Sequence, residues 1–338
     1  VFIINNKINK GVINMNNIKK IGLSALAGSL VAMSAASAGE MTISGGASVG
    51  VSQGKEENAS AYYMNDSINF TWSGETDSGL TVSQKIEVEG GVDNQSTSIA
   101  GAFGTISFHK HGGDSVMSGW DDKTPNAYDE PWGVVSSDTN TTGTNEVNII
   151  NGISGDNLWR YDSPSFNGIS VHASYLQAGQ AASEGSGASV GSYSDMGIQI
   201  APEMVEGLTI GYAVGEVDET ATKSNDESTL WITYAYGPLT VGYQTSEVDG
   251  QTTTEDDEGE AFGISYAVTD DFSVSYGTNE VDLGSATAAG TDQEAEGISA
   301  SYTMGGVSIS IAMNEVKNAG GSTADDHDAY DLNVAFAF

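Results

Sequence analysis

The stretch AFGISYAVTDDFSVSYGTNEVD, residues 261–282, alternates apolar residues with small or polar ones on both sides of a short TDD turn. In its first half Phe262, Ile264 and Tyr266 alternate with glycine, serine and alanine. A period of two is typical of a strand with two different faces, and TDD at 269–271 fits a hairpin turn. The stretch therefore predicts two antiparallel strands joined by a tight connection.

The same pattern repeats from Gly39 nearly to the end of the chain. It recurs in MTISGGASVGVS, LTVSQKIEVE, LTIGYAV, LWITYAY, LTVGYQT, GISASYT and VSISIAM. The short turns are at 74–79, 163–168, 202–207, 237–238, 269–271 and 304–306, and the longer polar stretches are at 53–61, 90–95, roughly 112–155, 178–190, 218–226, 249–257, 282–291 and 317–327. Alternating short and long connections predict a meander of upright strands with all long loops at one end. Counting a tight pair around 101–104, we expect about sixteen strands.

The character of the two faces decides the class of fold. One face is rich in Val, Ile, Leu, Tyr and Phe, and the other carries mainly Ser, Gly, Thr and Ala. A soluble sandwich would turn a charged face to water, whereas these small polar residues suit a water-filled interior. Strands of ~9 to 11 residues match a tilted crossing of the hydrocarbon layer, and a closed ring leaves no edge unpaired in lipid. The sequence predicts an all-β fold, a sixteen-stranded antiparallel transmembrane β-barrel.

Aromatic residues gather near the predicted strand ends, where they would form girdles at the membrane interfaces. The alternative is that each is simply a strand-favouring residue. The candidates are Trp72, Trp159, Tyr236, Tyr266, Tyr302 and Phe338. The closing stretch DLNVAFAF, 331–338, reads as the last strand, with Leu332, Val334 and Phe336 toward lipid and Asp331 toward the lumen. It must pair with the first strand, MTISGGASV, to remove both sheet edges.

The composition limits the partners. The 338 residues include 46 Asp and Glu against 11 Lys and Arg, a formal net charge of -35. Nucleic acid is excluded as a partner because it would be repelled, whereas cations would be attracted. We expect the carboxylates to lie in the loops and in the water-filled interior. The chain has no Cys, so a disulfide framework and thiolate chemistry are excluded.

The start of the chain predicts export. MNNIKK from Met15 is a basic region, IGLSALAGSLVAMSA is apolar, and ASA precedes Gly39, as in a secretory signal peptide. A single transmembrane helix is the alternative, but the apolar run is short of the ~20 residues that a span needs. Residues 1–14 look like translated upstream sequence. We therefore expect an upstream extension at 1–14, a signal peptide at 15–38 and a barrel at 39–338.

Three hairpin-like stretches carry a family resemblance: residues 261–282, LWITYAYGPLTVGYQTSEVD at 230–249 and LWRYDSPSFNGISVHASY at 158–175. With the terminal aromatic Phe338, they resemble the sixteen-stranded general-diffusion porins of Gram-negative bacteria, particularly the alphaproteobacterial type. The resemblance implies an integral outer-membrane homotrimer that contacts lipid and lipopolysaccharide. It also implies a water-filled pore, an inward-folded third loop, and recognition of Phe338 by the barrel assembly machinery.

The third loop of that family sets the constriction. Residues 112–155 are the longest stretch without alternation and follow the fifth expected strand. Trp120 and Trp132 suit an ordered loop, although an acidic loop solvated outside the barrel is the alternative. The enterobacterial motif Pro-Glu-Phe-Gly-Gly is absent, and YDEPWG at 128–133 is a loose analogue. The candidate constriction residues are Asp121, Asp122, Asp129 and Glu130.

The opposite wall departs from the arginine cluster of such porins, because Arg160 is the only arginine in the chain. Alternation places Arg160, Lys85, Glu87 and His172 on the polar face. The alternative role for Arg160 is a structural ion pair with Asp162, two residues along the same face. Since acids outnumber bases, we expect a pore that favours cations, as carboxylate rings do in cation channels.

The sequence gives weaker support for a metal site or an enzyme. His109 and His111 could hold a metal, but lumen lining is the simpler interpretation. Acidic runs could bind Ca²⁺ as a structural ion, above all at Asp256, Asp257 and Glu258, although a solvated loop is the default. We expect no other cofactor. A membrane Ser-His-Asp hydrolase would need Ser and His beside lipid, whereas His172 shares a lumen face with Ser170 and Ser174, so we expect no enzyme.

Two hypotheses follow. The first is a passive channel for small hydrophilic solutes and ions. The second is a structural or adhesive outer-membrane barrel whose acidic loops bind a partner and whose interior is plugged. Strand number separates them, because about sixteen strands leave an aqueous interior whereas about eight do not.

Overall fold

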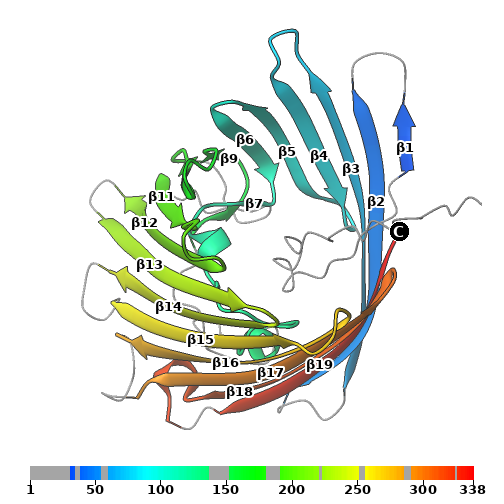
Figure 1. The fold of residues 1–338 in the computed structure, drawn as a ribbon. Coiled ribbons are helices and arrows are strands. Elements are labelled where there is room, and N and C mark those ends of the chain that lie inside the picture. The colour runs from blue at the N-terminus through cyan, green and yellow to red at the C-terminus, as the bar shows by residue number, and fades with distance from the viewer. Residues whose placement is uncertain are drawn as a thin grey trace, which may run out of the picture.

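A computed structural model describes residues 31–34, 39–54, 60–136, 152–179, 191–220, 223–250, 256–284, 291–323 and 326–338. Sixteen strands form a closed ring in which every neighbouring pair is antiparallel (Figure 1). They are β2 (Glu40–Gly54), β3 (Ala61–Glu75), β4 (Thr81–Val88), β5 (Val92–Gly101), β6 (Gly104–His111), β9 (Leu158–Asp162), β10 (Ile169–Leu176), β11 (Tyr193–Ile200), β12 (Leu208–Thr220), β13 (Lys223–Tyr236), β14 (Leu239–Asp249), β15 (Asp257–Ala267), β16 (Phe272–Leu283), β17 (Gln293–Met304), β18 (Val307–Lys317) and β19 (His327–Ala337). The predicted sixteen-stranded antiparallel barrel is confirmed.

The ring closes between β19 and β2, as predicted from the last and first strands. The register pairs Ala337 with Gly46 and Val334 with Val49. Beyond β19, the Phe338 N–H donates to the Gly45 carbonyl at 2.9 Å, and the Gly45 N–H donates to the Phe338 carbonyl at 3.2 Å. The main chain of the terminal aromatic residue therefore extends the seam.

A short strand at the start of the described chain was not predicted. β1 (Val31–Ser34) pairs antiparallel with Glu40–Ile43 of β2. Those residues of β2 lie beyond the end of β19, so β1 covers an edge that would otherwise be open. The predicted upstream extension at 1–14, and the predicted signal peptide apart from β1, lie outside the described residues, and both stay predictions.

Tight turns join the strands at one end of the barrel. Gly168 and Gly207 adopt φ of 81° and 88°, a left-handed conformation that glycine reaches without strain. Two of the expected long connections are short, because β4 and β5 are separated only by Glu89–Gly91, and β12 reaches Thr220 before β13 begins at Lys223. Charged residues that were expected in these two loops lie in the strands instead.

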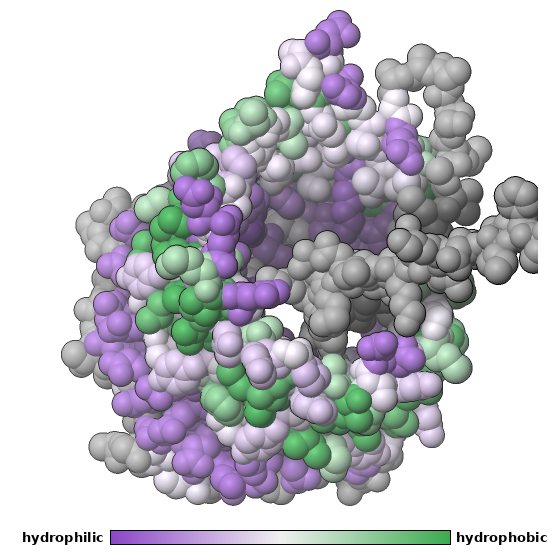
Figure 2. Space-filling model, in the orientation of Figure 1, coloured by the Kyte–Doolittle hydropathy of each residue, from purple (hydrophilic) through white to green (hydrophobic). Residues whose placement is uncertain are grey.

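The outward face is apolar where the barrel meets lipid. All six girdle candidates are exposed, from Trp72 at 37% to Tyr236 at 72%. Figure 2 shows hydrophilic residues on the inner surface that is visible behind β3–β6. In β10 the outward residues are Ile169, Val171 and Tyr175, opposite the polar face on which alternation placed His172. Among the described residues no helix is long and apolar enough to cross a membrane.

The polarity of the faces reverses at the loop ends of β15–β18, which corrects the expectation that carboxylates occupy only loops and interior. Glu260, Glu280 and Glu294 are exposed on the outward face and are direct partners across β15, β16 and β17. The inward residues beside them, among them Ala261 and Val281, are buried. Because a carboxylate that faces hydrocarbon is costly, we infer that these ends lie beyond the hydrocarbon layer, where the outward face meets water. Their inward face packs on the loop after β6.

A matched pair of substitutions on β13 tests which face meets lipid. Ile232 faces outward and is 40% exposed, whereas Thr233 shares the inward face with buried Trp231. We expect Ile232→Arg to lower the free energy of unfolding by about 2–4 kcal/mol, because a charge then lies in hydrocarbon. Thr233→Arg should cost far less because its charge is solvated in the lumen. Urea titration in lipid vesicles measures both, and equal losses would contradict this assignment of faces.

Candidate functional site

The long segment between β6 and β9 follows the fifth strand of the ring, where the constriction loop was predicted. It contains β7 (Gly113–Asp114) paired with β8 (Ser154–Gly155), a helical turn at Ser118–Trp120 and α1 (Gly133–Ser136). Figure 1 shows β7 within the curve of the wall strands. Residues 137–151 of the predicted loop lie outside the described chain. We refer to residues 112–136 as the loop.

The loop is attached to polar side chains of the wall. Its main-chain N–H groups donate to oxygen atoms from six strands between β10 and β18. The pairs are Val116 to Ser174 Oγ (3.0 Å), Met117 to Asp195 Oδ2 (2.8 Å), Lys123 to Gln244 Oε1 (2.7 Å), Ala127 to Ser275 Oγ (2.9 Å), Tyr128 to Ser299 Oγ (3.0 Å) and Val134 to Asn314 Oδ1 (2.9 Å). An irregular segment lacks ladder partners, and these side chains satisfy its backbone donors. All six acceptors lie on the strand face opposite the exposed apolar belt.

A row of four glycines gives the loop room. Gly242, Gly263, Gly277 and Gly297 are direct partners across β14, β15, β16 and β17. A Cβ atom on Gly263 would lie 2.8 Å from Thr124 Cβ and 2.9 Å from Pro125 Cδ, and one on Gly297 would lie 2.7 Å from Pro131 Cα. Such distances are closer than carbon atoms pack. The glycines are therefore required by the close approach of the loop.

Two tryptophans of the loop are buried, which fits the ordered loop predicted from them. Trp120 packs edge-on against Trp231 of β13, with ring centroids 5.4 Å apart. Trp132 joins Val134, Ala261 and the buried alanines of β17–β19 in a hydrophobic cluster. The loop therefore packs on the wall through two apolar clusters, one around Trp120 and one around Trp132. Trp231 was missed as an anchor, although alternation in LWITYAY places it inward.

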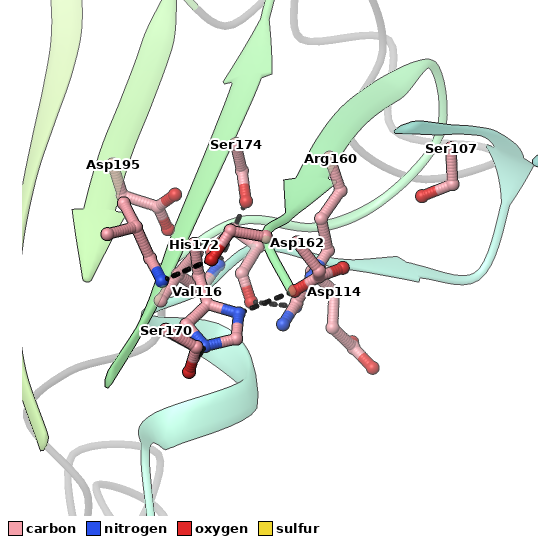
Figure 3. A network of polar contacts seen from close by, with 12 residues as sticks. Ser107, Asp114, Val116, Arg160, Asp162, Ser170, His172, Ser174 and Asp195 are labelled. Carbon is pink, nitrogen blue, oxygen red and sulfur yellow. Dashed lines mark hydrogen bonds and ion pairs between the residues drawn. The ribbon is translucent and has the colours of Figure 1, made fainter. Parts of the chain in front are cut away.

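The predicted wall residues Arg160 and His172 meet at Asp162 (Figure 3). Arg160 Nε lies 3.2 Å from Asp162 Oδ1, and His172 Nδ1 lies 2.7 Å from the same oxygen. Arg160 Nη1 also donates to the main-chain carbonyls of Asp114 and Ser115, at 2.9 and 3.0 Å. The alternative of an Arg160–Asp162 ion pair is confirmed, and Arg160 in addition fastens the root of the loop to β9.

The other two predicted wall residues form a separate pair. Lys85 Nζ lies 3.1 Å from Glu87 Oε2 on the inward face of β4, and Asn69 of β3 donates to Glu87 Oε1 at 3.1 Å. The neighbouring carboxylate therefore balances the Lys85 charge. Lys85 and Glu87 are not joined by these contacts to Arg160 and His172, so the four wall residues form two groups.

The four loop acids lie in two pairs. The Asp122 side chain accepts the N–H and the hydroxyl of Thr124, both at 2.7 Å. Burial, with the nearby charge of Glu130, raises the pKa of Asp122 to about 7. Burial, a hydrogen bond with the Glu130 side chain and the charge of Glu130 raise the pKa of Asp129 to about 8. Near neutral pH the loop therefore carries less negative charge than its sequence suggests.

The far end of the loop is held by a carboxylate at the seam. Tyr128 of the loop donates to Asp331 Oδ2 at 2.7 Å, and Tyr63 of β3 donates to both Asp331 oxygens at 2.9 Å. Asp331 was predicted to face the lumen from the alternation in β19, but this role was not foreseen. Its two partners lie in distant parts of the chain, so no local pattern shows them.

The predicted metal residues do not converge. Asp257 and Glu258 are neighbours on β15 and point to opposite faces, and Asp256 Oδ1 and Asp257 Oδ1 accept N–H groups of Gly250 and Gly284. No group of three His, Asp or Glu residues able to hold a metal is found within the described ranges. Structural Ca²⁺ stays a prediction.

Replacing a glycine of the row by a larger residue tests whether the row allows the close approach of the loop. We expect Gly263→Val to cost about 1–3 kcal/mol of loop packing through overlap with Thr124 and Pro125, and to push the loop away from the wall. Single-channel conductance in a planar bilayer should fall. The control is Gly91→Val, because a Cβ there has no atom within 4 Å. An unchanged conductance for Gly263→Val would contradict the tight fit.

Comparison with known proteins gives the family. A family model described as Gram-negative porin matches residues 22–321. The structure is similar to the anion-selective porin from Comamonas acidovorans, with 15% identity, coverage of 89% of this chain and 100% of that one, and a TM-score of 0.64. It is also similar to the trimer form of OmpT of Vibrio cholerae, at 13% identity, coverage of 89% and 100%, and a TM-score of 0.61.

Salmonella typhi OmpF, solved in complex with daunomycin, has 11% identity to this chain, coverage of 89% of it and 98% of OmpF, and a TM-score of 0.62. A comparison with curated proteins gives no match. Structures this distant show a shared fold, whereas the family model spans most of the chain. The chain belongs to the Gram-negative porins, channel-forming barrels that are integral to the outer membrane.

Proposed function

We propose that this porin is a passive diffusion channel for small hydrophilic solutes and ions, with a modest preference for cations. The observation that carries the proposal is the pairing of the predicted wall cations. Lys85 is paired with Glu87, and both Arg160 and His172 contact Asp162. A wall whose bases are balanced by its own acids offers no excess positive charge across the pore from the loop.

The position of the loop supports a constriction. Beyond its root, which contacts β5, β6 and β9, the loop contacts strands between β10 and β19, so most of the inward face of β2–β6 is left to line the remaining space. That lining is hydroxyl- and amide-rich. It includes Ser67, Asn69, Thr71, Ser83, Ser96 and Ser98. Such groups replace part of the hydration of a polar solute without selecting one shape, which suits general diffusion.

The sixteen-stranded ring favours a channel over the structural or adhesive alternative, because a barrel of this size encloses an aqueous interior. The anion selectivity named for the Comamonas porin belongs to that protein, and at 15% identity it carries no expectation for this chain. The expectation that the chain is not an enzyme, the alphaproteobacterial type, and the contacts with lipopolysaccharide and with the assembly machinery through Phe338 stay predictions.

Selectivity should depend on pH. Asp122 and Asp129, with pKa values of about 7 and about 8, gain negative charge as pH rises. We expect the cation-to-anion permeability ratio, measured as the reversal potential in a KCl gradient, to increase from about pH 6 to about pH 9. No conductance steps would contradict the channel, and an anion-signed potential at high pH would contradict the charge argument.

Replacing Asp122 and Asp129 by neutral isosteres tests whether these two residues cause the pH dependence of selectivity. Asp122→Asn combined with Asp129→Asn should flatten the pH dependence while the protein still conducts, because these side chains then carry no charge at any pH. Glu280→Gln is the matched control, since Glu280 lies on the outward face away from the loop. If the double variant keeps the wild-type pH dependence, other groups set the selectivity.

We propose further that the porin is a homotrimer whose contacts use the outer face of β2–β5. Asp66 is exposed there between Met64 and Ile68, which are 68% and 47% exposed. A carboxylate facing lipid is costly, so a second copy that covers this face would relieve the cost. The Vibrio cholerae OmpT structure in a trimer form supports this state.

Cross-linking of the protein in native membranes tests the oligomer. We expect a series of bands that ends at three copies. Asp66→Arg should shift it toward single copies, whereas Met196→Gln on the outward face of β11 should leave it unchanged. A single-copy band for the wild type would contradict the trimer, and an unaltered series for Asp66→Arg would contradict the assigned face.

A further inference from the structure

Three side chains on the lumen wall form an arrangement that passive diffusion does not require. Ser170 and His172 lie two residues apart on the inward face of β10, and the register places Asp162 of β9 directly opposite His172. Ser170 Oγ lies 3.0 Å from His172 Nε2, and His172 Nδ1 lies 2.7 Å from Asp162 Oδ1. A hydroxyl, an imidazole and a carboxylate are therefore connected in sequence (Figure 3).

The hydrogen bonds fit one protonation state. With Nδ1 protonated, the imidazole donates to Asp162, and its Nε2 accepts the hydroxyl proton of Ser170. This is the tautomer that a general base requires beside a serine nucleophile. Ser170 and His172 are partly exposed on the lumen face, so a solute in the pore can reach them.

The surroundings fix the imidazole. Asp162 is held on its other side by Arg160, whose Nε lies 3.2 Å from each carboxylate oxygen. The indole of Trp120 packs edge-on against the His172 ring with centroids 5.6 Å apart. It occupies space above Gly197, the residue opposite His172 on β11, where a Cβ would lie 2.7 Å from the indole. The loop thus shields one side of the histidine.

A second serine–histidine pair in the same wall provides an internal comparison. Ser107 Oγ lies 3.0 Å from His109 Nε2 on β6, the same spacing along a strand. His109 Nδ1 is buried, and among the described residues it has no hydrogen-bond partner. Ser107 is itself buried. Of these two pairs, the one on β10 combines a partnered imidazole with an accessible hydroxyl.

In contrast to the expectation from the sequence that the chain is not an enzyme, we propose that Ser170, His172 and Asp162 form an acyl-transfer triad in the pore, which attacks small carboxylic esters that enter it. Ser170 Oγ forms a bond to the ester carbonyl carbon as its proton moves to His172 Nε2. The alkoxide leaves as the ester C–O bond breaks and takes that proton, which releases an alcohol. Water then attacks the acyl group, gives a proton to His172, and the acid departs as Ser170 Oγ regains the proton.

The reaction is slow, because the nearby main chain offers little help to a developing oxyanion. The Val171 N–H donates to Ser163 Oγ at 2.8 Å, and β10 pairs on both sides with β9 and β11. General-base assistance alone contributes roughly 10² to 10⁴ in rate. Labelling of Ser170 by an irreversible reagent is therefore a more sensitive test than turnover.

Diisopropyl fluorophosphate is a suitable probe, because attack by Ser170 Oγ forms a P–O bond, expels fluoride and leaves a stable adduct. Folded protein in detergent is treated and digested, and the modified peptides are identified by mass spectrometry. We expect a Ser170 adduct, and no adduct on Ser107 or on Ser48 of β2. Absence of the Ser170 adduct, or equal labelling of Ser48 or Ser107, overturns the proposal.

Variants test whether Ser170 is labelled because His172 activates it or merely because it is exposed. His172→Gln should reduce the Ser170 labelling rate at least about 10²-fold, Asp162→Asn should also reduce it, and Ser48→Ala should leave it unchanged. Conductance in a planar bilayer reports whether each variant is folded. Unaltered labelling in conducting His172→Gln overturns the triad but leaves the proposed channel intact. Channel failure would instead appear as lost conductance in the wild type.

Discussion

Closure of the backbone hydrogen-bond network is the constraint on which the rest of this porin depends. Hydrocarbon offers no partner to a free N–H or carbonyl group, so the sheet must join its last strand to its first. Pairing of β19 with β2, extended by Phe338 and Gly45, achieves this. Once the ring is closed, strand alternation leaves one face for lipid and one for water, and every functional group must come from the inward face or from a loop.

The segment between β6 and β9 also needs partners for its backbone N–H groups, and wall side chains provide them. It has few ladder partners, so wall side chains such as Ser174, Asp195 and Gln244 accept its N–H groups. The glycines of β14–β17 let it approach the wall closely, while Trp120 and Trp132 give it an apolar core. Its position leaves the lining of β2–β6 for solutes, which links the packing of the loop to the function proposed for the pore.

Charge in the pore follows from pairing and burial more than from composition. Asp162 serves both Arg160 and His172, and Glu87 balances Lys85, so these wall bases do not oppose the loop as free cations. Burial keeps Asp122 and Asp129 partly protonated near neutral pH, which weakens the field that 46 acidic residues suggest. Other carboxylates, including Glu260 and Glu280, lie on the outward face where the strands leave the membrane.

Residue alternation is enough to predict the class of fold, the strand number, the closing pair of strands and the inward positions of Arg160, His172 and Asp331, because a period of two in the sequence maps directly onto the two faces of a strand. It also located the loop, because alternation stops there. Which inward residues contact one another depends on strand register and on the packing of distant segments, and the pattern does not show it. The cluster at the seam joins three distant segments, which contribute Tyr63, Tyr128 and Asp331. The register of β9 with β10 places Asp162 beside His172, which also contacts Ser170. Side-chain protonation was likewise decided by burial, which arises when the loop packs on the wall and has no counterpart in a linear pattern.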